Sequence, residues 1–427
     1  MLIKDLHFDP SGDRPRVVAT IKWEDCERPG MDLYFETDPA FSDALSCNPN
    51  AFLLAAVIPA MRHGERRIGI EGEICPQLRE GLMEVMAWLK HWFGGKRKII
   101  AIEARSISQT PPPVPERAAF LFSGGIDSLA TLRANRLNIP PTHPGSFKDG
   151  LLIFGLDVEK PEAFEHVLKR LSVVAAEAGI NLVPVYTNER YLDDDWAFWA
   201  YEFQGAALSA AAHVLNRRLT GVSIGATYDL ENLAPWGSHP LLDSNFSSHE
   251  LRVRHDGLRL SRLEKTRLLA GWDVALNHMR VCNKSETYRA DQLNCGRCEK
   301  CLRTKLALIS VGALSRSRAF ADDDVSEEAA AQIAIGDQYV ASCYPELVRP
   351  LRNAGREDLA RGIERALARY RGETGLFGPL KRMDRAYFND GIRKIKRHIA
   401  SAGWKMKLLA YFFGSACCSL ESAGMSL

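Results

Sequence analysis

Short apolar runs alternate with longer amphipathic stretches along much of the chain. The runs at residues 16–23, 31–37, 96–104, 118–123, 150–157, 180–187 and 221–226 predict strands. Apolar residues at helical spacing predict helices at residues 51–64, 77–95, 162–179 and 204–218. From residue 118 onward a strand is regularly followed by a helix, which is typical of a doubly wound parallel sheet. We therefore expect an α/β fold.

A proline-rich stretch divides this pattern into two parts. Residues 108–117 read SQTPPPVPER, which excludes a helix interior and favours a stiff, extended linker. We expect an N-terminal mixed α/β domain over residues 1–107 and a second α/β domain over residues 118–310. Residues 311–427 are expected to form a helical extension, with an amphipathic stretch at 357–372 and a basic one at 381–400. The apolar stretch at 408–418 is too short to span a bilayer.

Composition excludes several classes of protein. The chain has 427 residues, 46% of them hydrophobic and 25% charged, and its net charge is only +2. This charge gives no global field that would attract nucleic acid or a membrane surface, so we expect neither as a partner. No apolar run reaches the roughly 18 residues of a membrane span, and residues 1–10 lack the apolar core of a secretion signal. We expect a cytoplasmic protein.

One glycine turn carries the first candidate chemistry. Ser123-Gly124-Gly125-Ile126-Asp127-Ser128 follows a predicted strand and precedes a helix that we expect to begin near Ser128. Two adjacent glycines let backbone N–H groups close around an anion, and the helix N-terminus adds its positive dipole. Asp127 would then hold a Mg²⁺ that bridges it to a phosphate. The alternative is a plain glycine turn with Asp127 as the helix cap.

A group of cysteines carries the second candidate chemistry. Cys295, Cys298 and Cys301 are spaced by three residues, and Cys282 lies thirteen residues before the first of them. Four thiolates at this spacing are typical of a closed, structural Zn²⁺ site. An iron–sulfur cluster and four free buried cysteines are the alternatives, although Lys305 stands where a ferredoxin-type run would have its fourth cysteine.

The glycine turn resembles the PP-loop signature of the N-type ATP pyrophosphatases. That resemblance implies a HUP-type sheet and an enzyme that cleaves ATP between its α and β phosphates to adenylate a substrate. It implies ATP-binding roles for Ser123, Gly124, Gly125, Ile126, Asp127, Ser128 and Gly155. Together with the cysteines and the nearby Arg303, the chain resembles the 7-cyano-7-deazaguanine synthases (QueC) from residue 118 to about residue 308. This second resemblance implies that Asp127 and Lys265 are catalytic, with Lys265 in contact with phosphate.

The presumed substrate loop differs from that of the synthases. Residues 225–250 are rich in Gly, Pro and Ser and follow a predicted strand, which is where α/β folds bind ligands. A planar heterocycle needs an aromatic plate and paired hydrogen bonds. We therefore assign a substrate-binding role to Asp229, Trp236, His239 and Asp243 from this loop, with Ser247 as a further candidate and Arg303 from beyond it. The alternative for each alone is a structural role.

The resemblance implies an ATP-dependent amidating ligase that needs ATP, Mg²⁺ and Zn²⁺. Its expected substrate is a carboxylate such as 7-carboxy-7-deazaguanine, and its acceptor is ammonia or an amine of a partner protein. The long flanks resemble those of diverged relatives in anti-phage defence systems (QatC-like), and a homodimer is compatible with the sequence. The alternatives are an RNA-thiolating PP-loop enzyme and a nucleotide-binding assembly subunit without turnover.

Overall fold

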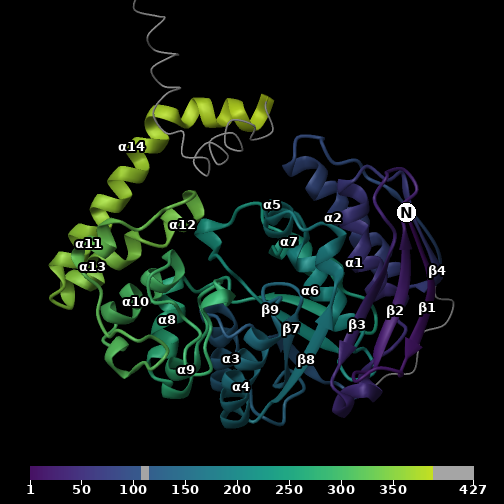
Figure 1. The fold of residues 1–427 in the computed structure, drawn as a ribbon, viewed down its shortest axis with the longest axis horizontal. Helices are drawn as coiled ribbons and strands as arrows, with labels where there is room; N and C mark the ends of the chain where they lie inside the picture. Colours follow the sequence, from purple (N-terminus) through teal and green to yellow (C-terminus); the bar gives the residue numbers. More distant parts are fainter. Residues whose placement is uncertain (107–114, 388–427) are drawn as a thin grey trace, which may run out of the picture. The chain divides into compact units, whose positions relative to one another are not determined.

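The computed structural model describes the backbone of residues 1–106 and 115–387 and the side chains of residues 1–106 and 115–372. The chain divides into two units, Met1–Glu364 and Arg365–Leu427. Within the described residues of the first unit, ten strands form one sheet in the order β10-β9-β6-β7-β8-β3-β2-β1-β4-β5 (Figure 1). The strands are β1 (Leu2–Asp9), β2 (Arg16–Lys22), β3 (Met31–Thr37), β4 (Arg67–Ile74), β5 (Ala101–Ser106), β6 (Ala118–Leu121), β7 (Phe147–Phe154), β8 (Asn181–Thr187), β9 (Gly221–Gly225) and β10 (Arg252–Asp256).

Helices and short turns connect these strands. The helices are α1 (Pro49–Arg62), α2 (Pro76–Trp92), α3 (Ile126–Asn138), α4 (Pro161–Ala178), α5 (Trp196–Phe198), α6 (Gln204–His213), α7 (Pro240–Asp243), α8 (Arg262–Ala270), α9 (Asp273–His278), α10 (Glu299–Ser310), α11 (Glu327–Ala331), α12 (Gln338–Ser342), α13 (Pro345–Asn353) and α14 (Glu357–Tyr387). A π-helical segment, Trp199–Phe203, joins α5 to α6. Helix α6 ends at His213, five residues before the predicted end at residue 218, and turns follow it.

Five strands form the parallel part of the sheet. Each neighbouring pair in the order β10-β9-β6-β7-β8 is parallel, as the alternation of strand and helix predicted. The chain runs from β6 outward to β7 and β8, and then returns to the other side of β6 to form β9 and β10. Ligands of open α/β sheets bind at the carboxyl ends of the strands where the winding reverses. That position is the end of β6, where the glycine turn begins.

The N-terminal strands extend the same sheet. β3 pairs antiparallel with β8, with Phe35 opposite Thr187, and β1, β2 and β3 are antiparallel neighbours. β4 is parallel to both β1 and β5. The whole sheet is therefore mixed and mostly parallel, rather than parallel throughout. The division into separate domains at residues 108–117 stays a prediction, and residues 107–114 lie outside the described part.

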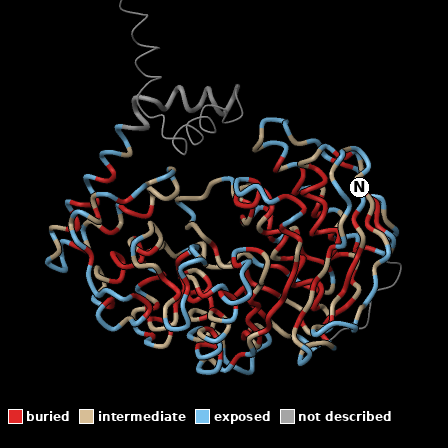
Figure 2. Tube along the Cα trace, viewed as in Figure 1, coloured by how far each residue is buried: buried red, intermediate tan, exposed pale blue. Residues whose placement is uncertain are grey.

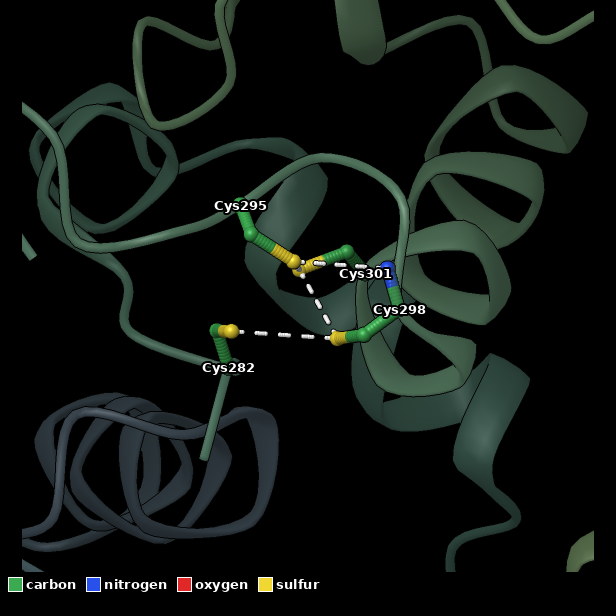
Figure 3. A group of neighbouring side chains, drawn as sticks. All are labelled: Cys282, Cys295, Cys298 and Cys301. Carbon is green, nitrogen blue, oxygen red and sulfur yellow. Dashed lines mark hydrogen bonds between the residues drawn. The ribbon is translucent and has the colours of Figure 1, made fainter. Parts of the chain in front are cut away.

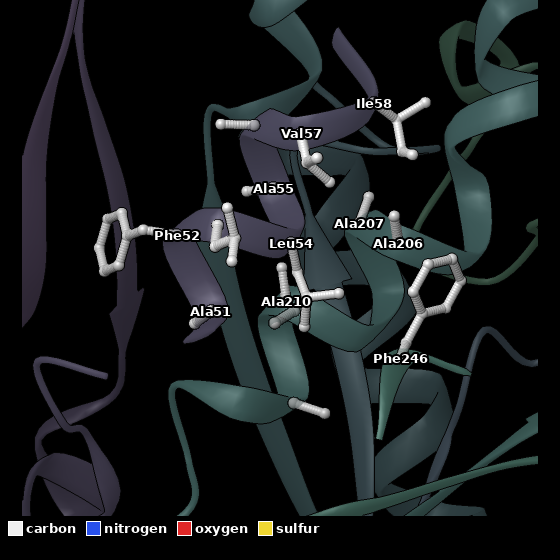
Figure 4. Close-up of a cluster of buried hydrophobic side chains, with 14 of the residues drawn as sticks. Ala51, Phe52, Leu54, Ala55, Val57, Ile58, Ala206, Ala207, Ala210 and Phe246 are labelled. Carbon is white, nitrogen blue, oxygen red and sulfur yellow. The ribbon is translucent and has the colours of Figure 1, made fainter. Parts of the chain in front are cut away.

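Helices cover both faces of the sheet. Successive residues of a strand point to opposite faces: Ala119 and Leu121 of β6 join one buried cluster, and Phe120 and Phe122 join the other. Helices α1 and α6 pack together on the first face, where Leu54 and Ala206 belong to the same cluster (Figure 4). Helices α3, α4 and α9 supply the second cluster. Figure 2 shows these buried layers on both sides of the strands.

The chain after the sheet is helical as far as it is described. Helices α10 to α13 follow in sequence, and α14 begins at Glu357. The predicted basic stretch at 381–400 lies only partly in the described residues, and the apolar stretch at 408–418 lies outside them. Among the described residues, no helix has both the length and the apolar character to cross a membrane.

Candidate functional site

The glycine turn between β6 and α3 has a backbone that only glycine adopts easily. Gly124 has a φ of +78°, and a Cβ there would lie 2.8 Å from the buried side chain of Leu171. Its carbonyl accepts a hydrogen bond of 2.8 Å from the backbone N–H of Arg280. Helix α3 begins at Ile126, two residues earlier than expected. Its first turn directly follows the glycine turn. The turn therefore presents backbone N–H groups and the positive end of a helix dipole at the switch point.

Asp127 lies in this first turn and is clamped by two cations. Arg262 contacts one carboxylate oxygen at 2.6 Å, and the Nζ of Lys265 contacts the other at 3.1 Å. Burial acts to raise the pKa of Asp127, but Arg262 and Lys265 outweigh it and hold the pKa below its ordinary value. Lys265 is 2% exposed and also donates to the carbonyl of Ala226. The structure thus brings together the two predicted catalytic residues and adds Arg262, which the sequence analysis missed.

A cavity of about 240 Å³ opens at the glycine turn. Four cationic side chains line it besides Asp127: Arg262, Arg280, Lys300 and Arg303. They come from α8, from the loop after α9 and from α10, and of the four only Arg303 was singled out from the sequence. So many positive charges around a helix N-terminus suit a polyanion such as a polyphosphate.

The surroundings of Lys300 lower the pKa of its ammonium group. Burial lowers the pKa of Lys300; Asp157 opposes this, whereas Arg303, Arg262 and Arg280 lower the pKa further. An anion placed among these side chains would offset both the lost hydration and the mutual repulsion. The electrostatics of the cavity therefore favour an anionic ligand.

Apolar and aromatic side chains also line the cavity. Leu152, Trp199, Leu208 and Ile224 line it, together with Trp236. The indole N–H of Trp236 donates to Gln204 at 3.0 Å, and Tyr201 packs against the Trp236 ring edge-on at 5.0 Å. A fixed aromatic ring beside an apolar wall suits a planar ligand.

The predicted substrate residues separate into two groups. Trp236 and Arg303 line the cavity, as stated above. Asp243 and His239 are not among its lining residues, and both are held by protein groups. The buried carboxylate of Asp243 accepts from Ser238 at 2.7 Å and contacts the Nδ1 of His255 at 2.7 Å.

His239 and the two remaining loop residues also make local contacts. His239 caps α7, with its Nδ1 accepting from the Leu241 N–H at 3.1 Å. Asp229 caps the short 3-10 helix Leu230–Asn232. Ser247 bonds the backbone of Val253 on the edge strand β10. These contacts favour the structural alternative for all three residues.

Gly155 was predicted to contact ATP and follows β7. It has a φ of +94°, and a Cβ there would lie 1.9 Å from the carbonyl oxygen of Thr187. This close approach of two backbones explains the glycine without a ligand, and the residue is not among those that line the cavity. Its role in ATP binding stays a prediction.

The four predicted cysteines converge on one point (Figure 3). Their sulfur atoms all lie within 4.8 Å of one another. The pairs Cys282–Cys298, Cys295–Cys301 and Cys298–Cys301 are 3.7, 3.9 and 3.4 Å apart. A tetrahedral Zn²⁺ with Zn–S bonds of about 2.3 Å spaces its sulfurs by about 3.8 Å. The group could therefore hold a metal such as zinc. Because a multi-iron cluster holds its ligands farther apart, this spacing favours a single ion.

The loop that carries the cysteines is tied to the glycine turn. Arg280 donates to the carbonyl of Ser123 at 3.2 Å and to the hydroxyl of Tyr288 at 2.7 Å. The Tyr288 hydroxyl in turn donates to the carbonyl of Cys282. Lys300 and Arg303 flank Cys301 at the start of α10. The cysteine group therefore fixes the segments that bring three of the four cations to the cavity.

A comparison of the chain with family models, curated proteins and solved structures gives no match.

Proposed function

We propose that the protein is an adenylating enzyme of the PP-loop type that uses ATP and releases AMP and pyrophosphate. The convergence of the glycine turn, the N-terminus of α3 and four cations on one cavity carries this proposal. The apolar and aromatic side chains that line the same cavity suit a planar group bound together with the phosphates. The HUP-type winding order of the parallel strands supports the same class.

The chemistry assigned to the site is transfer of the adenylyl group. An oxygen of a substrate carboxylate attacks the α-phosphorus of ATP, the bond to the bridging oxygen breaks, and pyrophosphate leaves with that electron pair. An amine then attacks the acyl carbon, so that AMP leaves, an amide forms and one proton is released. We assign Arg262, Arg280 and Lys300, which line the cavity, and Lys265, which holds Asp127, to stabilising the negative charge on pyrophosphate as it leaves.

Asp127 and the cysteine group are assigned the two metals. The lowered pKa of Asp127 keeps it ionised, and each of its oxygens has a free lone pair beside the bond to Arg262 or Lys265. It therefore suits Mg²⁺, which typically binds one carboxylate together with phosphates and water. Zn²⁺ at the cysteines is structural, because four thiolates leave no open position.

We assign a planar carboxylic acid as the substrate, with 7-carboxy-7-deazaguanine as the first candidate. We assign the protein to the cytoplasm. We assign Trp236 to the ring and Arg303 to an acidic group, because both line the cavity. The acceptor is ammonia or an amine of a partner protein. A defence role stays a prediction from the resemblance, and a homodimer stays a possibility that the sequence allows. RNA thiolation finds less support, because the four clustered cysteines have sulfur spacings that suit a metal.

Product analysis tests this proposal. Purified protein receives Mg-ATP with and without 7-carboxy-7-deazaguanine and ammonium, and nucleotides and pyrophosphate are quantified. We expect AMP and pyrophosphate in equal amounts, dependent on the acid, and loss of both in Asp127→Asn. The matched control is Asp291→Asn, which changes an exposed acid on the cysteine loop. Release of ADP, or nucleotide binding with no turnover for any acid, would contradict the proposal.

A further inference from the structure

Three neighbouring residues of the C-terminal helical region contact the two helices that supply cations to the cavity. The sulfur of Cys343 lies 3.2 Å from a guanidinium nitrogen of Arg303 on α10. The Tyr344 hydroxyl donates to Glu299, also on α10, at 2.7 Å. Glu346 accepts a hydrogen bond of 3.0 Å from the backbone N–H of Leu263 on α8. The segment 343–346 therefore bridges α8 and α10, and helix α13, which begins in this segment, packs on α10 (Figure 1).

The contact made by Glu346 adds to the N-terminal cap of α8. The first N–H groups of a helix have no partner within the helix. Ser261 and Glu264 form a capping box, which satisfies the N–H of Glu264 and that of Ser261. The N–H of Leu263 has its partner in Glu346, eighty-three residues later in the chain. A carboxylate at this end also matches the positive pole of the helix dipole.

This capped turn is the one that clamps Asp127. Arg262 is the first residue of α8, and Lys265 follows three residues later. Fraying of the first turn would move both cations away from Asp127, and it would move Arg262 away from the cavity. Glu299, held by Tyr344, lies 3.3 Å from Arg303 in turn. Residues 343–346 thus support the two helices, α8 and α10, that carry Arg262, Lys300 and Arg303.

We propose that Glu346 is a positioning residue of the anion site, acting through the first turn of α8 to hold Arg262 and Lys265. The part of this proposal that concerns ATP rests on the proposed function, whereas the cap itself does not. The conservative variant separates the hydrogen bond from the bulk of the side chain. Glu346→Gln keeps an oxygen that can accept from Leu263, and Glu346→Ala removes it.

The experiment measures two quantities on the full chain. Isothermal titration gives the affinity for inorganic pyrophosphate in the presence of Mg²⁺, and hydrogen exchange reports on the amides of residues 262–269. Loss of a helix cap costs enough to weaken binding by about 5- to 30-fold. We expect this loss and faster exchange in Glu346→Ala, with both quantities within about threefold of wild type in Glu346→Gln. Glu357→Ala, which removes an exposed carboxylate that pairs with Arg352, is the matched control.

The outcomes separate the two proposals. Unchanged affinity and exchange in Glu346→Ala would overturn the positioning role, as would a Gln variant as weak as the Ala variant. If wild type binds no pyrophosphate or ATP while exchange in α8 still rises only in Glu346→Ala, the cap stands and the proposed function fails. A melting temperature for each variant shows whether the effect is local to α8.

Discussion

His213 at the end of α6 should make the stability of the protein fall as the pH is lowered from 7 to 5. Its side chain is fully buried, its Nε2 lies 2.9 Å from the carbonyl oxygen of Phe246, and its Nδ1 has no hydrogen-bond partner. Burial lowers the pKa of His213 from 6.5 to about 4, and the bond to Phe246 only partly opposes it. The folded protein therefore keeps this imidazole neutral at a pH where the unfolded chain protonates it.

The size of this pH effect on the free energy of unfolding follows from the difference in the pKa of His213 between the folded and unfolded states. The stabilisation is complete above pH 6.5 and is lost as the pH falls toward about 4, because the unfolded state then binds one more proton. The change in pKa from 6.5 to about 4 corresponds to about 3 kcal/mol in total. At pH 5 the unfolded state gains about 2 kcal/mol from this proton, and at pH 7 it gains about 0.2 kcal/mol.

Urea unfolding at pH 5, 6 and 7 measures this dependence in wild type and in His213→Gln. The glutamine amide can still donate to Phe246 but does not titrate. We expect the free energy of unfolding of wild type to drop by about 2 kcal/mol more than that of the variant between pH 7 and pH 5. His143→Gln, at an exposed position, is the control and should follow wild type. Equal drops in wild type and His213→Gln would refute the reasoning.

Three further changes test other parts of the structure. Cys298→Ser removes one of four metal ligands, so metal analysis should show loss of bound zinc and calorimetry a lower melting temperature. Gly155→Ala places a Cβ 1.9 Å from the carbonyl oxygen of Thr187 at a positive φ, and urea unfolding should show a loss of about 2–5 kcal/mol. Lys300→Met removes a cation from the cavity, and titration with Mg-pyrophosphate should show affinity about tenfold weaker.

For each of these three substitutions, one result would contradict the structural reason given for it. Zinc retained at one ion per chain in Cys298→Ser would show that the metal does not depend on that thiolate. Wild-type stability in Gly155→Ala would mean that β7 and β8 do not approach as closely as described. Lys284→Met changes an exposed position on the cysteine loop and is the control. If Lys284→Met and Lys300→Met weaken the affinity for Mg-pyrophosphate equally, Lys300 does not contact the anion in the cavity.

The parts of the site that are local in sequence could be predicted from the sequence. The glycine turn and the four cysteines are each defined by spacing within a short stretch, and the structure brings the cysteines together. Arg262 could have been found, because it lies three residues before Lys265 on the same helical face. Arg280 and Lys300 had no such signal, since their approach to the turn depends on the path of the loop between them.

The extent of the sheet could not be predicted in the same way. β1, β4 and β10 were missed because their patterns are weak. β1 is only partly buried, and β4 contains Gly69 and Gly72, which disfavour strands. β10 has charged or polar side chains at all of its positions except Val253. The pairing of Phe35 in β3 with Thr187 in β8 joins residues far apart in the chain, and no local pattern encodes it. Likewise, nothing in the sequence near Glu346 indicates that it caps α8.

The transfer of one labelled oxygen would test the central claim most directly. A carboxylate that stimulates AMP release, such as 7-carboxy-7-deazaguanine, is labelled with ¹⁸O in its carboxyl group, and the AMP is analysed by mass spectrometry. Adenylation followed by amide formation leaves one carboxyl oxygen on the phosphate, so the account predicts AMP that carries one ¹⁸O atom. AMP that carries only solvent oxygen would mean that water attacks the α-phosphate, and the assignment of an acyl adenylate would be wrong.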